Sequence, residues 1–81
     1  MTVLEIRIEL KKGVADPEGE NTKKALELLG FEVKSVKSIK VFDIELDEEN
    51  PDKAVEIGKE MCRKLLANPV IHKYSVEVKR E

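Results

Sequence analysis

The hydrophobic residues of this chain follow two spacings, and the spacing changes at turn residues. Between residues 3 and 10, apolar and charged side chains alternate, which predicts a strand with one buried face. Alternation returns near the end of the chain, where Tyr74, Val76 and Val78 share one side. The segments between these two strands are expected to carry the helices.

The first helix is predicted up to about Leu29, and Gly30 ends it because glycine readily takes the left-handed conformation. Before it, Asp16, Pro17 and Gly19 occupy the first, second and fourth places of a type I turn. The alternative is that Asp16 caps the helix and Pro17 is its first residue. The helix has a predicted inward stripe, which consists of Thr22, Ala25, Leu26 and Leu29.

Residues 31–46 cannot form one regular strand, because their apolar positions change from odd to even numbers near Lys37 and Ser38. A slip of one residue would turn every side chain to the other face. We therefore expect two strand sections, at about 32–38 and 39–46, separated by a bulge, a crossing point or a tight hairpin.

The second helix is predicted from Pro51, with Asn50 as its cap, to about Ala67. The Asn68-Pro69 step then stops it and starts the last strand. The buried stripe of this helix is expected to contain Ala54, Ile57, Gly58, Met61, Cys62, Leu65 and Leu66.

This order of elements predicts an α+β fold, a ferredoxin-like βαββαβ arrangement in which two helices cover one face of an antiparallel sheet. The other face would be open, and dimerisation through the sheet is the simplest way to cover it. The chain of 81 residues is expected to form a single domain, residues 1–81, whose small core favours a homo-oligomer.

The composition argues against several classes of function for this chain. The net charge of -2 with mixed signs, and only three aromatic residues, argue against a nucleic-acid partner. The sequence has no apolar run long enough for a membrane span and no signal-peptide core, so we expect no membrane association and a cytoplasmic location. One cysteine excludes an internal disulfide and is compatible with a reducing compartment.

Candidate chemical groups each have a simpler structural interpretation. His72 lacks recognisable catalytic or metal-binding partners, and we expect it to be half-buried or at an interface. Cys62 falls on the apolar stripe of a helix, where cysteine acts as a small hydrophobic residue. No residue is predicted to be catalytic, to bind a cofactor or to bind a metal.

Two charged segments are also candidate ligand sites. The acidic residues Asp47, Glu48, Glu49 and Asp52 could hold a hard cation, but favourable interaction with a helix N-terminus explains them better. The run Lys11-Lys-Gly13 could contact a phosphate, yet no complete glycine-rich phosphate motif is present, so a connecting loop is the expectation.

Two blocks of sequence resemble the PurS family, the small subunit of phosphoribosylformylglycinamidine synthase. The first contains Leu10-Lys-Lys-Gly-Val14 and Asp16-Pro-Glu-Gly19, continuing to Ala25-Leu26 and Leu29-Gly30. The second contains Met61-Cys62, Leu65-Leu-Ala-Asn-Pro-Val-Ile71 and Tyr74. One departure is Lys37-Ser-Ile-Lys40, where the family often has Arg-x-Gly-Lys; Ile39 replaces the glycine and the two positive charges remain.

The resemblance implies a non-catalytic assembly subunit of an EC 6.3.5.3 ligase in purine biosynthesis. It would bridge a glutaminase subunit (PurQ) and a synthetase subunit (PurL), form a dimer or tetramer, and support ammonia transfer. ATP and Mg would be used by the synthetase, and this chain would bind no cofactor. The expected subunit-contact residues are Asp16, Pro17, Gly19, Lys37, Lys40, Asn68, Pro69, His72 and Tyr74.

One other function class fits part of the sequence, and a second does not. An ACT-like regulatory domain would bind a small molecule, such as an amino acid, at a dimer interface. An acylphosphatase-like hydrolase would require a substrate-binding loop with arginine and asparagine, and we find no such loop in the sequence.

Overall fold

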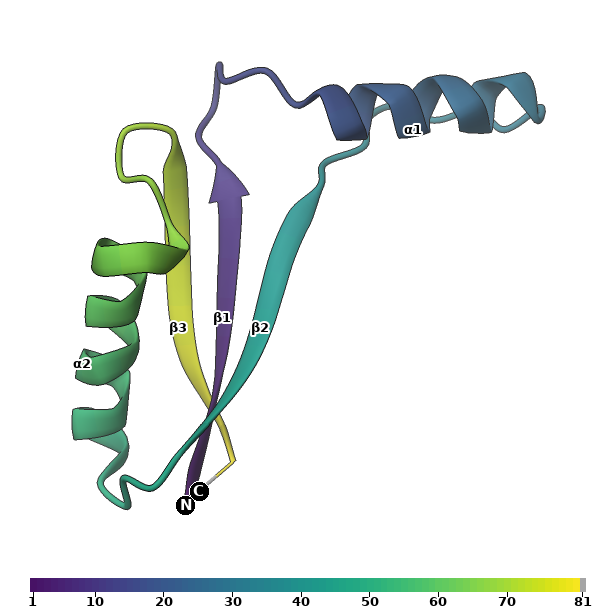
Figure 1. Ribbon diagram of the computed structural model, residues 1–81. Helices are drawn as coiled ribbons and strands as arrows, with labels where there is room; N and C mark the ends of the chain where they lie inside the picture. Colours follow the sequence, from purple (N-terminus) through teal and green to yellow (C-terminus); the bar gives the residue numbers. More distant parts are fainter. Residues whose placement is uncertain (81) are drawn as a thin grey trace.

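The computed structural model describes residues 1–80, which form a three-stranded sheet, two α-helices and one π-helical turn (Figure 1). In chain order the elements are β1 (Thr2–Leu10), α1 (Pro17–Leu28), β2 (Ile39–Leu46), α2 (Pro51–Met61), η1 (Cys62–Leu66) and β3 (His72–Arg80). The α+β class and the ferredoxin-like order are confirmed, apart from the expected second strand.

β1 is the central strand and pairs antiparallel with β2 on one side and β3 on the other. Leu4, which is fully buried, lies between Ile44 of β2 and Val78 of β3. Alternate residues of all three strands therefore form one apolar core face. Buried Leu4, Ile6 and Ile8 are at its centre.

The opposite, outer face of the sheet is mainly charged. Glu5 of β1 lies between Asp43 and Glu77, and Lys79 Nζ donates a hydrogen bond of 2.9 Å to Asp43 Oδ2. A face of this composition can be solvated and does not need an apolar cover. Dimerisation through this face remains a prediction.

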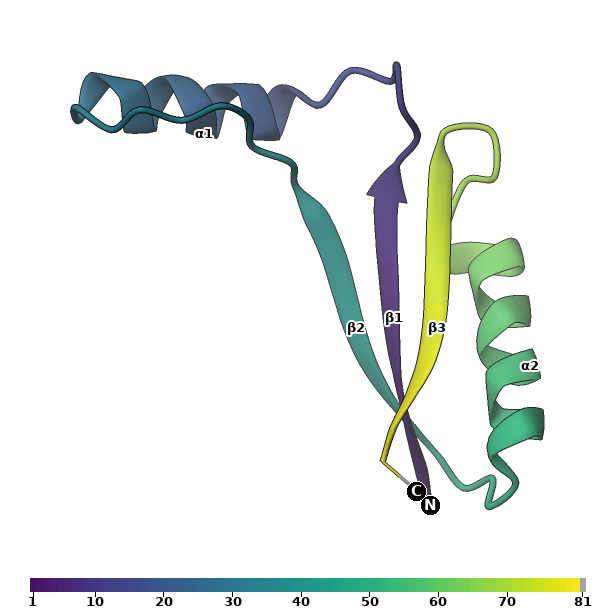
Figure 2. The ribbon, with the colours of Figure 1, turned by 180° about the vertical axis from the view of Figure 1, so that it is seen from behind.

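Helix α2 packs along the core face, mainly over β1 and β3 (Figure 2). Its contact surface is made of small residues one turn apart, because Ala54, Gly58 and Cys62 are all buried. A Cβ atom at Gly58 would lie 2.8 Å from Leu4 Cδ1 and 2.9 Å from Val76 Cγ1. The helix thus lies closer to the sheet than larger residues would permit.

The second helix continues as η1 and ends at Ala67, as expected from the sequence. The amide of Ala67 donates to the carbonyl of Cys62 at 3.0 Å, a bond across five residues that widens the last turn. In this turn Leu66 is half-buried, whereas Leu65 is 83% exposed. Leu65 and Ile57, at 37% exposure, are therefore corrections to the predicted buried stripe.

Helix α1 does not cover the sheet. Figures 1 and 2 show it projecting sideways from one end of the sheet, with residues 31–38 returning alongside it. We call residues 17–38 the arm. The prediction that two helices cover one sheet face is thus wrong within a single chain, and in the predicted inward stripe only Leu26 is half-buried.

The predicted strand section at 32–38 is also wrong, whereas the section at 39–46 is confirmed as β2. Residues 31–38 run back beside α1 and have no strand beside them to pair with. The change of apolar phase near Ser38 marks the point where the chain leaves the arm and enters the sheet. In place of the bulge, crossing or hairpin expected there, the structure has the junction between the arm and the sheet.

The arm makes the molecule extended. The Cα radius of gyration is 15.8 Å, whereas a compact domain of this length has about 12 Å. Within residues 1–80, no helix combines the length and the apolar character needed to cross a membrane.

Candidate subunit-contact site

Most of the residues that the sequence singled out lie at one end of the sheet. We call this the arm end, because β1 ends there, β2 and β3 begin there, and the arm is attached there (Figure 1). Two loops meet the strands at this end, residues 11–16 and 67–71. The contact residues predicted in distant parts of the sequence are thus brought to one region.

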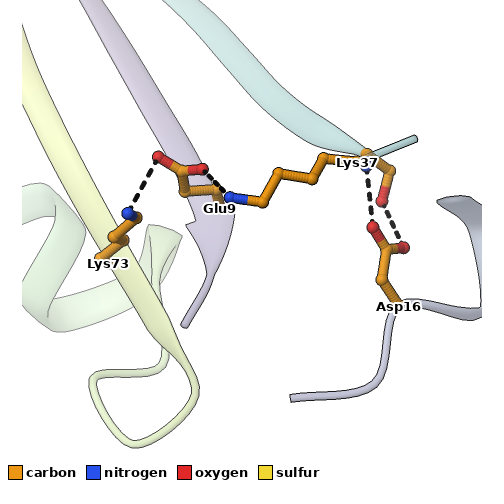
Figure 3. A network of polar contacts seen from close by, with 5 residues as sticks. Glu9, Asp16, Lys37 and Lys73 are labelled. Carbon is orange, nitrogen blue, oxygen red and sulfur yellow. Dashed lines mark hydrogen bonds and ion pairs between the residues drawn. The ribbon is translucent and has the colours of Figure 1, made fainter. Parts of the chain in front are cut away.

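Asp16 ties together the two ends of the arm, beside the sheet. It is the N-cap of α1, with Pro17 as the first helical residue, so the capping alternative is correct and the isolated turn is not. One carboxylate oxygen, Oδ1, accepts from the amide of Gly19 at 3.0 Å and from Ser38 Oγ at 2.8 Å. The other, Oδ2, accepts from the amide of Ser38 at 2.8 Å (Figure 3).

These bonds join the two chain segments that connect the arm to the sheet. The hydrogen bond from the Ser38 amide, followed by those from the Gly19 amide and the Ser38 hydroxyl, favours the charged carboxylate. The pKa of Asp16 is therefore lowered from its ordinary value of 3.8.

Gly19 is buried where residues 31–38 meet the first turn of α1. A Cβ atom there would lie 2.6 Å from the carbonyl oxygen of Val36 and 2.7 Å from Asp16 Oδ2. Gly19 is therefore needed for close packing inside the arm. Its predicted role as a subunit-contact residue is not supported by an exposed surface.

Glu9 links the arm attachment to the sheet. One of its carboxylate oxygens lies 3.4 Å from Lys37 Nζ and the other 3.7 Å from Lys73 Nζ (Figure 3). Both lysines are more than half exposed, so these ion pairs add little stability. Their effect is to place two cations and a carboxylate on the accessible arm end.

The loop at residues 67–71 is held by its own side chains. The amide of Asn68 donates to His72 Nδ1 at 2.9 Å, and Asn68 Oδ1 accepts from the amide of Val70 at 3.0 Å. Lys11 Nζ donates to the carbonyl of Pro69 at 2.7 Å, which ties this loop to the end of β1. The half-buried position expected for His72 is confirmed, and its Nδ1 stabilises the loop.

The remaining predicted contact residues differ in accessibility. Lys40 is exposed in β2 opposite Ile8, so it is available to a partner. Tyr74 is half-buried on the core face, also opposite Ile8, and packs against the core.

Cys62 is fully buried at the start of η1, as expected for a small hydrophobic residue. Burial raises the pKa of its thiol above the ordinary value, so the reactive thiolate is disfavoured. Across the described part of the chain, no group of three or more His, Cys, Asp or Glu residues is placed to hold a metal ion. In the acidic run, Glu48 Oε2 accepts from the amide of Asn50, the N-cap of α2, at 3.2 Å, and Asp52 lies in the first turn of that helix.

A second candidate region of the surface lies outside the contact residues predicted from the sequence. An open, mainly apolar groove lies on the core face between β2 and the end of the second helix, and we call it the β2 groove. Leu65 is its most exposed apolar residue. Its lining residues are Ile44, Glu60, Met61, Lys64, Leu65 and Leu66.

Comparison with known proteins identifies the family. The family model for PurS, described as phosphoribosylformylglycinamidine (FGAM) synthase, matches residues 3–80. The chain belongs to the PurS family. The resemblance seen in the two sequence blocks is therefore confirmed.

PurS relatives match almost the whole chain. The PurS subunit of FGAM synthase from Archaeoglobus fulgidus is 56% identical over 75 residues, which cover 91% of this chain and 94% of that protein. The corresponding subunit from Methanocaldococcus jannaschii is 51% identical over 74 residues, covering 90% of this chain and 89% of that protein.

Two solved structures extend the comparison to three dimensions. The crystal structure of Methanocaldococcus jannaschii PurS, one of the subunits of formylglycinamide ribonucleotide amidotransferase, matches with a TM-score of 0.91 and 49% identity, covering 100% of this chain and 99% of that chain. A chain in the structure of PurLQS from Thermotoga maritima matches with a TM-score of 0.86 and 36% identity, covering 95% of each chain.

The first of these matches bears directly on the arm. The arm is about a quarter of the chain, and a TM-score of 0.91 over the whole chain could not be reached if that quarter were placed differently. The projecting arm is therefore shared with a PurS crystal structure.

The sequence had not identified Glu9, Ser38 and Lys73 as part of the arm end. Ser38 had a usable signal, because it lies at the change of apolar phase, while Glu9 and Lys73 resemble ordinary outer-face residues.

Proposed function

We propose that this chain is the non-catalytic assembly subunit of FGAM synthase, the glutamine- and ATP-dependent enzyme that converts FGAR to FGAM in purine biosynthesis. The observation that carries the proposal is the likeness over 95% of both chains to a component of the Thermotoga maritima PurLQS assembly. In this proposal the chain bridges a glutaminase subunit (PurQ) and a synthetase subunit (PurL) and acts in the cytoplasm as one domain.

The side chains support an assembly role. The only histidine is engaged through Nδ1 in a loop, and the only cysteine is buried with a raised pKa. The synthetase would use ATP and Mg, and the glutaminase would release ammonia from glutamine. Holding two active sites in fixed, enclosed positions limits the loss of ammonia to water.

The arm end is the region that we assign to contact with the other subunits. It combines exposed Lys37, Lys40 and Lys73 with a loop whose shape is fixed by Asn68. Pro17 and Pro69, both exposed, limit the flexibility of the two segments. Asp16 acts by positioning the arm, since its carboxylate is occupied by Gly19 and Ser38.

Omission from a reconstituted enzyme tests this function. Purified PurL and PurQ partners, ATP, Mg, FGAR and glutamine should give FGAM only when this chain is added, whereas ammonium salt should support turnover without it. Cys62→Ala and His72→Gln should change glutamine-dependent turnover by no more than a few-fold, because neither side chain has a chemical role. Full glutamine-dependent turnover without the chain would refute the proposal.

The ACT-like alternative makes a different prediction. A ligand-binding domain should show a higher melting temperature when a free amino acid is added, whereas an assembly subunit should respond only to its partner proteins. A stabilising amino acid would favour the regulatory function.

A further inference from the structure

We propose that His72 makes the loop at residues 67–71 a pH-sensitive element of the arm end: the neutral imidazole holds the loop in its observed shape, and protonation releases it. This inference rests on the proposed assembly function, because it gives a means of regulation to the region assigned to subunit contact. Three observations carry it: the direction of one hydrogen bond, the bonds that share the loop, and the charges around the ring.

The bond between Asn68 and His72 requires a neutral imidazole. The amide of Asn68 donates to His72 Nδ1 at 2.9 Å. A neutral imidazole has one nitrogen that accepts, whereas both nitrogens of the protonated ring carry hydrogen and can only donate. Protonation would therefore place two N–H groups against each other and abolish this bond. Histidine is the side chain whose charge ordinarily changes between about pH 5 and 8.

The bond to the imidazole is one of several that meet at Asn68. The carbonyl of Asn68 accepts from the amides of Ile71 at 3.1 Å and of His72 at 2.8 Å. Its Oδ1 accepts from the amide of Val70 at 3.0 Å. The tip that these bonds shape is accessible, because Pro69 is exposed and Val70 is 78% exposed. A change at the His72 ring is therefore transmitted to a surface that a partner can contact.

His72 is half-buried and also lines an open cavity whose charged groups come from three elements. β1 contributes Glu9, α1 contributes Glu18 and β2 contributes Lys40, while η1 contributes the apolar Leu66. Two carboxylates and one ammonium group give the cavity a negative balance. A protonated ring can thus be accommodated here without burying an unpaired charge.

Other charges near His72 are cationic and oppose its protonation. Lys11 Nζ is bound to a carbonyl of the same loop at 2.7 Å, and Lys73, the next residue of β3, lies 3.7 Å from Glu9. The charged residues of η1, Arg63 and Lys64, are exposed and do not line the cavity. The surroundings are therefore mixed in sign, so the loss of the amide bond is the main structural effect of protonation.

The release is expected to stay local. Asn68 is exposed, so its amide can bond to water once the ring no longer accepts. His72 remains opposite Leu10 in the sheet, and the amide of Lys11 still donates to the carbonyl of Ile71 at 2.8 Å. Protonation should therefore loosen the loop while β1 and β3 stay paired.

Nuclear magnetic resonance of the full chain tests the switch directly. Near pH 8, well above the ordinary histidine range, the ¹⁵N shifts of His72 should show the tautomer protonated at Nε2. Exchange of the Asn68 amide, followed by magnetisation transfer from water and corrected for free-amide rates, should become about fivefold faster as the ring is protonated. The amide of Ile6 in β1 should keep its protection.

Two variants provide matched controls. His72→Asn places an oxygen acceptor near the position of Nδ1 but does not titrate, so Asn68 should stay protected across the same pH range. His72→Ala removes the acceptor, so Asn68 should exchange rapidly throughout. A ring protonated at Nδ1 near pH 8, exchange of Asn68 that does not follow the titration of the ring, or an equal change in His72→Asn would overturn the switch.

Binding to PurL and PurQ tests the regulatory consequence. The affinity of the unaltered chain, divided by that of His72→Asn at the same pH, should fall a few-fold as the ring is protonated. A constant ratio alongside the change in Asn68 exchange would overturn regulation of assembly through this loop. The omission experiment decides the assembly role separately, because the exchange measurements need no partner.

Discussion

Helices α1 and α2 begin in the same way and reach different environments. Asp16-Pro17 starts α1 and Asn50-Pro51 starts α2, each with a side-chain cap and a proline in the first turn. α2 turns a surface of small residues to the sheet, whereas α1 turns Gly19 to its own returning segment and leaves its stripe exposed. Equivalent helix starts therefore do not specify where a helix packs.

The two helices also differ in how they are stabilised within the chain. α2 and the sheet bury Leu4, Ile6 and Cys62 completely within one chain. The arm is stabilised mainly by local hydrogen bonds around Asp16 and by the close approach at Gly19. We infer that the sheet and α2 form the more stable part of the subunit, and that the arm is the less stable part.

The largest difference between the regions should appear when one large side chain is removed from each. Ile6→Ala, under α2, should lower the free energy of unfolding by about 2–5 kcal/mol, because it leaves a cavity in the core. Leu28→Ala removes a side chain that is 89% exposed and a quarter turn away from the stripe, so its cost should stay within about 0.5 kcal/mol. Urea denaturation at one protein concentration measures both; a larger cost for Leu28→Ala would contradict the comparison.

An intermediate effect, confined to the arm, is expected for Gly19→Ala. The added methyl group would meet the carbonyl oxygen of Val36 at 2.6 Å, and backbone cannot move aside as easily as a side-chain end. The local cost should be about 1–3 kcal/mol. Native-state hydrogen exchange should show faster exchange of α1 amides, with α2 amides unchanged.

The exposed Glu20 provides the control for this variant. Glu20→Ala changes the same helical turn without a clash and should leave the exchange rates of α1 almost unchanged. Faster exchange in both helices after Gly19→Ala would show that the arm and the sheet unfold together, against the distinction drawn between them.

The two regions were not equally predictable from the sequence. Alternation in β1 predicts its buried face correctly, and the stripe predicted for the second helix contains the buried Ala54, Gly58 and Cys62 but also the exposed Ile57 and Leu65. The periodicity of α1 predicts an apolar stripe, but helical periodicity does not identify the element against which a stripe packs, and this stripe is largely exposed. The contact residues were drawn largely from the family resemblance, and only the fold brings Asp16, Lys37 and Asn68 to one end of the sheet.

The smallest predicted effect concerns pH and the attachment of the arm. Because the pKa of Asp16 is lowered in the folded chain, its carboxylate stabilises the fold above pH 3.8, and this contribution is lost as the pH falls through the lower folded value. Asp16→Asn should therefore melt at a lower temperature than the unaltered chain near neutral pH, and the difference should shrink in acid. Melting curves followed by circular dichroism, from neutral pH to below 3.8, measure this difference, with the exposed Asp47→Asn as control. If the difference in melting temperature between Asp16→Asn and the unaltered chain stays constant into acid, the negative charge does not stabilise the arm. The difference would then be due to the shape of the capping group.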